Sequence, residues 1–205
     1  MAHAMKYISQ TSEKAWLEEA RTGDDEAFSL LVEAYQKPVY NLCYRMLGNH
    51  RDAEDAAQET FLRAYKHITR YDSQRKFSTW LLTIASNFCI DQYRRRKLPT
   101  LSYDSLPDPN IPEKSIDVES WMVEDEKNES VQMLLEILKP KDRSAVIMRY
   151  WYDFSYEEIA DALSISISAV KSRLHRSRKD LAYEWLSRQQ KMLPAERTRY
   201  ETPAY

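Results

Sequence analysis

Apolar residues recur at steps of three and four along most of the chain, a spacing that predicts helices. The clearest stripe would bury one face of a helix. It consists of Ala53, Ala56, Ala57, Thr60, Phe61, Ala64, Tyr65 and Ile68. Similar patterns predict a helix over about 28–46, which Pro38 should kink or break, and another over about 78–97. With one more helix at its start, the stretch 15–96 is predicted to form four helices.

The stretch 99–129 differs in composition from the segments on either side of it. It contains Pro99, Pro107, Pro109 and Pro112. Nine acidic residues stand against two lysines between Asp104 and Glu129. Because prolines interrupt regular structure and like charges repel, we expect an extended linker with at most a short helix around Trp121.

Helical periodicity returns at Val131 and continues to about Gln190. We therefore predict an all-α protein with two small helical domains, 15–98 and 130–190. The acidic, proline-containing linker 99–129 would join them, and the polar tail 191–205 should fray.

Composition narrows the possible chemistry. Only two of the 205 residues are glycines, which excludes glycine-rich nucleotide-binding loops. Cys43 and Cys89 fall on apolar helical patterns without a C-x-x-C partner, so we expect buried reduced thiols rather than a redox or metal pair. Neither a cofactor nor a metal is expected. The first residues lack the apolar core of a signal peptide and no apolar run reaches about 18 residues, which predicts a cytoplasmic protein without membrane insertion.

Residues 155–181 carry the pattern of a helix-turn-helix. Ser155 and Glu158 form a capping box that starts the first helix, and the break at 164–166 separates it from a second helix. Ala160, Ser164 and Val170 have the spacing of a helix crossing, a turn and a core position. The turn usually holds glycine, so Ser164 would carry a small cost there if its backbone is left-handed.

The second helix of this motif is strongly basic, although the net charge of the chain is only −2. Its basic residues are Lys171, Arg173, Arg176, Arg178 and Lys179. Such side chains neutralise phosphates and can read guanine edges in the major groove. Taken alone, such a helix is more simply interpreted as a basic face exposed to solvent. Because this helix is the second helix of a well-spaced helix-turn-helix, we favour DNA binding.

Two features of the first block add to this prediction. The stretch 52–65 carries acids and Gln58 on the face opposite its alanine stripe. Farther along, the aromatics Tyr71, Phe77 and Trp80 precede a basic helix end. Aromatic rings stack on unpaired bases while basic groups follow the backbone, a combination suited to single-stranded DNA.

Together these segments resemble the extracytoplasmic-function (ECF) sigma factors of the sigma-70 family. The matching strings are CYRMLGNHRDAEDAAQETFLRAYKHI, RKFSTWLLTIASNFCIDQYRRRK and SAVKSRLHRSRKDL. The resemblance covers roughly 20–97 and 130–187. It implies a transcription initiation factor that is not an enzyme. The implied partners are core RNA polymerase, through its β′ clamp and β flap, promoter DNA and an anti-sigma factor.

Carried over by position, the resemblance implies three surfaces. The polymerase-docking residues are Asp55, Gln58 and Glu59. The residues for the minus-ten element, read as single-stranded DNA, are Tyr71, Arg75, Lys76, Phe77, Ser78, Thr79, Trp80, Asn87, Asp91, Arg94, Arg95 and Arg96. The residues for the minus-thirty-five element are Ser168, Lys171, Ser172, Arg173, His175, Arg176 and Lys179. Trp80 also has the spacing of a core residue, and His175 could simply cover exposed helix surface.

An autonomous helix-turn-helix regulator is the main alternative. It would need a receiver or ligand-binding domain, and the first block lacks the strand–helix alternation of a receiver. An enzyme is disfavoured, because no metal-spaced His/Cys set, nucleophile elbow or carboxylate pair near a histidine is present. A pure adaptor would not need a basic recognition helix.

Overall fold

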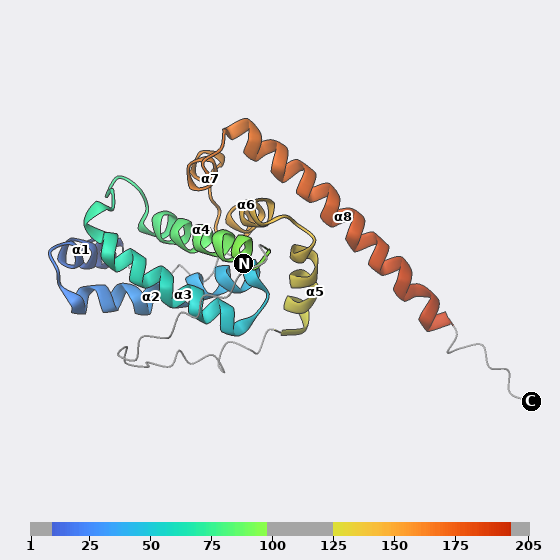
Figure 1. The fold of residues 1–205 in the computed structure, drawn as a ribbon, viewed down its shortest axis with the longest axis horizontal. Helices are drawn as coiled ribbons and strands as arrows, with labels where there is room; N and C mark the ends of the chain where they lie inside the picture. The colour runs from blue at the N-terminus through green and yellow to red at the C-terminus, as the bar shows by residue number, and fades with distance from the viewer. Residues whose placement is uncertain (1–9, 98–124, 198–205) are drawn as a thin grey trace, which may run out of the picture.

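The computed structural model describes residues 10–97 and 125–197, and it contains no strand in these ranges (Figure 1). The first block comprises α1 (Gln10–Arg21), α2 (Asp25–Leu47), α3 (His50–His67), a 3-10 turn (Ile68–Arg70) and α4 (Phe77–Lys97). The second comprises α5 (Asp125–Glu136), α6 (Pro140–Trp151), α7 (Tyr156–Leu163) and α8 (Ile167–Arg197). The predicted all-α fold is confirmed, and no helix in the described ranges is long and apolar enough to span a membrane.

Three details differ from the sequence prediction. α2 continues through Pro38 without a break, because the surrounding packing outweighs the one helical hydrogen bond that proline removes. α5 begins at Asp125, inside the stretch predicted to be linker, and α8 continues to Arg197, beyond the predicted start of the frayed tail. The rest of the linker, with the short helix expected around Trp121, lies outside the described residues.

Capping residues determine both ends of α2 and the start of α3. Asp24 accepts a hydrogen bond from the Ala27 amide at 2.9 Å and starts α2. Gly48 ends α2 in the left-handed region with φ 74°, where glycine carries no steric penalty. Asn49 then accepts from the Asp52 amide and starts α3. Helix α3 therefore folds back directly against α2.

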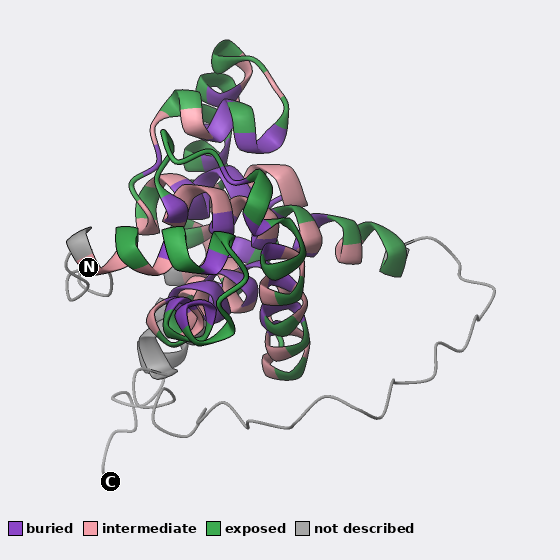
Figure 2. Ribbon diagram, turned by 90° about the vertical axis from the view of Figure 1, so that its left-hand side faces the viewer, coloured by how far each residue is buried: buried purple, intermediate pink, exposed green. Residues whose placement is uncertain are grey.

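Small residues on α3 allow its neighbours to approach closely. The stripe predicted from the sequence is buried at its small residues, with Ala53, Ala56 and Ala64 fully inaccessible. Phe61 is half-buried, and Tyr65 departs from the prediction because it is 45% exposed and its hydroxyl donates to Asp25 of α2. Helices α2 and α4 pack against this side, and the outer faces of the block stay exposed (Figure 2). Cys43 on α2 and Cys89 on α4 are both buried, as predicted. Hydrogen bonding to Cys89 and burial raise the pKa of the Cys43 thiol well above its usual value, which keeps that thiol protonated.

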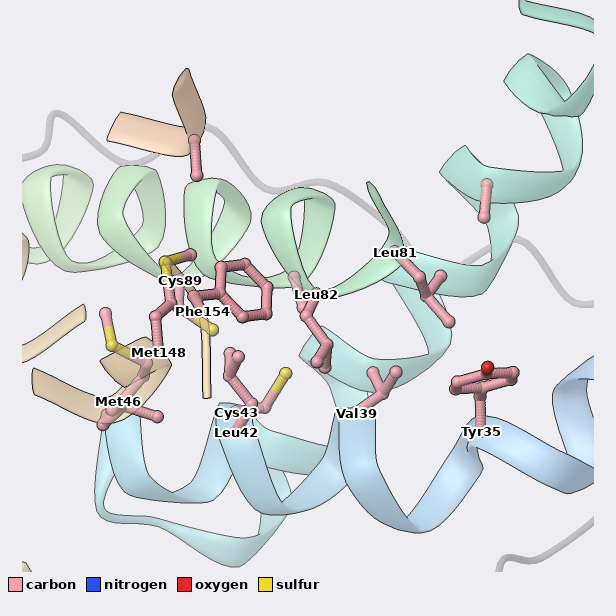
Figure 3. Close-up of a cluster of buried hydrophobic side chains, with 14 of the residues drawn as sticks. Tyr35, Val39, Leu42, Cys43, Met46, Leu81, Leu82, Cys89, Met148 and Phe154 are labelled. Carbon is pink, nitrogen blue, oxygen red and sulfur yellow. The ribbon is translucent and has the colours of Figure 1, made fainter. Parts of the chain in front are cut away.

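The two blocks share one apolar core. Met148 on α6 and Phe154 in the following loop lie in the same buried cluster as Met46, Cys43 and Cys89 of the first block (Figure 3). Met148 is fully inaccessible and Phe154 is 3% exposed. Burying apolar surface of this kind contributes about 25 cal/mol per Å². The second block is therefore packed onto α2 and α4.

Polar bonds cross the same interface. Arg143 on α6, itself buried, donates from Nη1 to the Met46 carbonyl at 2.6 Å and from Nη2 to the Glu136 carbonyl at 2.9 Å. The Met46 carbonyl belongs to the last turn of α2, where carbonyls lack helical partners and carry partial negative charge. Ser86 and Ser144 share a buried hydrogen bond of 2.6 Å at the crossing of α4 and α6. Tyr152 donates to the Pro38 carbonyl at 2.7 Å.

Replacing Arg143 should weaken the whole protein. We expect Arg143→Ala to lower the free energy of unfolding by roughly 2–3 kcal/mol, because it leaves buried carbonyls of both blocks without a donor. Arg149→Ala is the matched control, since Arg149 Nη1 donates to Phe154 within the second block only. Urea unfolding followed by circular dichroism measures both. Equal losses would contradict the role assigned to Arg143.

Candidate nucleic-acid interface

The loop between α3 and α4 is held in shape by its own residues. The Tyr71 hydroxyl donates to the Arg75 carbonyl across the loop. Asp72 accepts from the Gln74 amide at 3.0 Å, forming a local side-chain turn. The Arg75 amide donates to the Asp72 carbonyl. The loop thus presents the exposed side chains of Arg75 and Lys76 from a defined backbone.

The structure changes the interpretation of two of the three loop aromatics. Tyr71 is 5% exposed and Phe77 is 2% exposed, and their rings meet edge to face at 5.5 Å. Phe77 also packs on Tyr35 of α2. Neither ring is open to stack on a base here, so both position the loop instead. Trp80 is half-buried against Tyr71 and Phe77, in line with the core alternative.

The predicted residues on α4 divide into two groups. Asn87, Asp91, Arg94 and Arg95 are exposed, and Asp91 lies 3.7 Å from Arg94. Arg96 is instead paired with Asp52 at the start of α3. The hydrogen bond from Arg96 holds the pKa of the Asp52 carboxyl below its ordinary value. Arg96 therefore joins α4 to α3.

The outer face of α3 carries the predicted acidic surface. Asp55 and Gln58 are exposed on the side opposite the buried alanines. Glu59 is partly exposed and pairs with Arg63 at 2.7 Å, one helical turn later. Since none of the three contributes to the core, this face is available to a partner.

The predicted helix-turn-helix is formed by α7 and α8. Both hydrogen bonds of the Ser155–Glu158 capping box are present. Ser164 lies in the left-handed region with φ 52°, so this serine does occupy the conformation that usually selects glycine. Ser166 accepts from the Ala169 amide at 3.2 Å and starts α8. Val170 is buried, as the pattern predicted, and Leu174 one turn later is buried with it.

The opposite face of α8 is exposed. It presents Ser168, Lys171, Ser172, His175, Arg176 and Lys179. Arg173 differs from these because its guanidinium is bound to Asp142 of α6 at 2.6 Å and its side chain is 27% exposed. Arg173 therefore braces α8 against α6, while the other six remain accessible.

Two contacts join α7 of the second block to the predicted minus-ten residues, one in the loop and one in the first turn of α4. Arg75 Nη2 lies 3.3 Å from Asp161 Oδ2, and Thr79 Oγ1 donates to Glu158 Oε1 at 3.0 Å. A groove of about 380 Å³ runs between these elements. It is lined by Gln74, Arg75, Lys76, Thr79, Trp80, Thr83, Glu157, Glu158, Asp161 and Ala162.

Sequence reasoning did not identify the residues that join the blocks. Arg143 and Gln132 donate to carbonyls in the last turn of α2, and a backbone acceptor leaves no signature in the sequence. Glu158 was recognised only as a capping residue, although it serves α7 and Thr79 together. Among the described residues, no group of three or more His, Cys, Asp or Glu side chains is arranged to hold a metal ion.

Comparison with known proteins matches both blocks. Residues 31–98 match the family sigma-70 region 2, and residues 128–181 match sigma-70, region 4. The chain is 36% identical to the ECF RNA polymerase sigma factor SigW of Bacillus subtilis, over 82% of this chain and 94% of that protein. It is 32% identical to the ECF RNA polymerase sigma-E factor of Salmonella typhimurium, over 82% of this chain and 92% of that protein.

Solved structures share the fold. CnrH in complex with the cytosolic domain of CnrY aligns with a TM-score of 0.63 and 22% identity, over 86% of this chain and 98% of that one. The sigma factor RpoE of Bartonella quintana, in complex with the anti-sigma factor NepR, aligns with a TM-score of 0.55 and 23% identity. That alignment covers 75% of this chain and 93% of the other.

The turn of the helix-turn-helix offers a stability test. Ser164→Gly should raise the free energy of unfolding by roughly 0.5–1 kcal/mol, because glycine adopts the left-handed conformation without a steric penalty. Glycine also gives the unfolded chain more conformational freedom, which offsets only part of this gain. Ser166→Ala is the matched control and should lower the free energy of unfolding by about 1 kcal/mol through loss of the cap. Both are measured by thermal unfolding. A destabilising Ser164→Gly would show that the serine side chain itself is required.

Proposed function

Because the chain belongs to the ECF sigma factors of the sigma-70 family and directs transcription initiation, we propose that it acts through three binding surfaces and performs no catalytic step of its own. The observation that carries the proposal is the order of the matches: region 2 and region 4 lie in sequence on one chain, and each places exposed polar faces over a buried core.

The first surface is the outer face of α3. Asp55, Gln58 and Glu59 would dock on the β′ clamp of core RNA polymerase. Their support is exposure combined with independence from the core, since α3 is held by its alanine stripe and by contacts such as Asp52 with Arg96, which involve none of the three. The exposed acids would meet basic side chains on the polymerase, and opposite charge speeds and orients such docking.

The second surface reads and opens the minus-ten element. The exposed loop residues Arg75 and Lys76 and the half-exposed Ser78 and Thr79 would contact the unpaired strand. The exposed residues Asn87, Asp91, Arg94 and Arg95 of α4 would lie along the promoter, where the two arginines can contact its phosphates. Capturing an unstacked base costs a few kcal/mol, which contacts of this kind must offset.

The third surface is the exposed face of α8, which would read the minus-thirty-five element in the major groove. Lys171 and Arg176 lie on this face with His175 and the serines Ser168 and Ser172. The second block, which contains α8, would also contact the β flap of the polymerase. We propose the bounds 15–98 and 130–190 for the units that carry these surfaces.

The remaining partners follow from the same assignment. We propose core RNA polymerase and promoter DNA as obligate partners, with the cytoplasm as the place of action. An anti-sigma factor is proposed as the inhibitor, since the solved neighbour from Bartonella quintana is held by one. The alternative of an autonomous regulator is not favoured, because residues 31–98 of the first block match region 2.

The direct test is run-off transcription on genomic fragments with purified core polymerase. We expect defined transcripts only when this protein is added. Transcription that does not depend on the protein, or sequence-specific binding by the free protein near physiological salt, would support the regulator alternative.

The clamp-docking surface can be tested by substitution. Gln58→Ala combined with Glu59→Ala should abolish co-purification with core polymerase while leaving unfolding nearly unchanged, because both side chains lie outside the core. The matched control replaces the exposed pair Glu18 and Glu19 on α1 by alanine. Undiminished binding by the α3 variant would remove this face from the assignment.

The recognition helix can be tested for specificity. If Arg176 reads a base edge, Arg176→Ala should cost about 1–3 kcal/mol on the preferred promoter and little on one altered at the contacted pair. If Arg176 only contacts phosphate, the loss of binding free energy should be the same on every promoter. The slope of log affinity against log salt concentration should then fall by about one unit. Arg178→Ala, on another side of α8, is the control. Initiation that is unchanged in Arg176→Ala and in Lys171→Ala on every promoter would exclude this helix as the reader.

A further inference from the structure

A second pocket, with a volume of about 660 Å³, lies between the last turns of α4 and the start of α6. Its lining combines apolar or aromatic surface with cations: Ile90, Tyr93 and Pro140 on the one hand, and Arg94, Lys139, Lys141 and Arg173 on the other. Among the residues that the structure describes, no acidic side chain lines this basic pocket. Its volume is that of sites that hold a ligand.

The positive charge of the basic pocket is only partly neutralised. Arg94 and Arg173 are each paired with a neighbouring aspartate. Lys141 reaches only the Leu163 carbonyl, at 3.5 Å, and the exposed Lys139 is the N-cap of α6 without a side-chain capping bond. The positive end of the α6 dipole therefore lies beside two ammonium groups, and an anion would relieve their repulsion. The basic pocket is suited to an occupant that carries both carboxylates and apolar side chains.

The segment 98–124 supplies such groups within the same chain. It follows α4 directly, one helical turn after Arg94, and it joins α5 at Asp125. It contains six acidic residues and one lysine. The seven residues from Lys97 to Asp104 can span roughly 23 Å, whereas a helical turn back to the pocket is about 5.4 Å. Because the segment is tethered beside the pocket, its effective concentration there is high even if each contact is weak.

Within this segment, the stretch 103–108, with the sequence YDSLPD, has the pattern that the pocket requires. Alternate residues of an extended chain point to the same side, so Asp104, Leu106 and Asp108 would form an acid–apolar–acid face. Pro107 favours the extended conformation in the residue before it. This face is complementary to apolar surface flanked by cations.

We propose that the stretch 103–108 docks in the basic pocket of the free protein. Its two aspartates pair with Lys139 and Lys141, and Leu106 lies against the apolar lining. Pairs at such accessible positions are individually weak, so the tether is needed for the docking. The pairing neutralises the pocket within the molecule, which lowers its attraction for the phosphates of non-specific DNA. The inference concerns the free protein alone, so its test requires neither polymerase nor a promoter.

Zero-length cross-linking tests the proposal in the full, unaltered chain. A carbodiimide joins a carboxylate to a lysine amine only where the two groups are in contact, and mass spectrometry identifies the joined peptides. We expect bonds from Asp104 or Asp108 to Lys139 or Lys141. These bonds should be lost in about 1 M salt, where screening weakens accessible ion pairs. Bonds from the two aspartates only to lysines elsewhere would overturn the proposal.

The same experiment separates docking within one chain from docking between two copies. Isotope-labelled and unlabelled protein are mixed in equal amounts before the cross-linker is added. Docking within one chain gives joined peptides of a single label. Joined peptides of mixed label would assign the pocket to a second copy and would also overturn the proposal.

A second measurement compares matched variants of the segment. A nitroxide is attached at Ser105→Cys, and its broadening of the Lys141 and Arg173 amide signals is followed by nuclear magnetic resonance. Asp104→Asn combined with Asp108→Asn should largely remove this broadening. The control, Asp117→Asn combined with Glu119→Gln, removes the same charge from the same segment and should retain it.

Both variants alter only residues outside the described helices, so the helices themselves should be unaffected. Equal broadening in the two variants would show that the position of the acids is unimportant and would contradict the docking of 103–108. Absence of broadening in the labelled chain without either variant would also overturn the proposal, and would leave the basic pocket to an acidic peptide of another protein.

Discussion

The contact of Arg143 with the last turn of α2 is the constraint on which the arrangement of this protein depends. A buried guanidinium is tolerated where most of its donors are used. Here Nη1 and Nη2 of Arg143 meet carbonyls from both blocks, while Nε has no hydrogen-bond partner among the described residues. Burial lowers the pKa of Arg143, while the partial negative charge at the helix end favours the cation. One side chain thus joins a helix end of the first block to the fold of the second.

The position of α6 on α2 determines what the neighbouring elements meet. With α6 fixed, Met148 and Phe154 enter the core of the first block, and α7 is brought over the loop before α4. Helix α8 packs on α6 and α7 with Lys171 and Arg176 exposed, and its C-terminal end extends away from the other helices (Figure 1). The same packing that stabilises the fold therefore covers one proposed DNA surface and leaves the other accessible.

Acidic and basic residues lie on separate surfaces of the protein, although its net charge is only −2. Acids lie on the outer face of α3 and on α7, while bases lie at the end of α4 and on α8. Arg75 with Asp161 of α7, and Arg173 of α8 with Asp142 of α6, show that acidic and basic residues of different elements also pair within the molecule. Binding DNA or polymerase therefore competes with internal pairing as well as with water.

Local features of the fold could be predicted from the sequence, and contacts between distant segments could not. The stripe ending at Ile68, the Ser155 cap and the Ser164 turn each depend on residues a few positions apart, which the sequence displays directly. The burial of Tyr71 and Phe77 and the bracing role of Arg173 depend on which helix lies opposite. Periodicity finds the apolar face of a helix, but it cannot name the residue that covers it.

Asp161 and Glu158 of α7 engage Arg75 and Thr79 of the proposed minus-ten surface, so this surface can bind DNA only if the two blocks move apart on polymerase. The distance between the blocks, measured with and without polymerase, is therefore the most direct test of the proposed function. Spin labels at Arg70→Cys and Ala182→Cys would sit on exposed positions of either block, and the buried native cysteines should not react. Double electron–electron resonance spectroscopy then measures the distance between the two spin labels with and without core RNA polymerase. We predict one short distance distribution for the free protein and a longer one in the transcribing complex. The same distribution in both states would contradict the account.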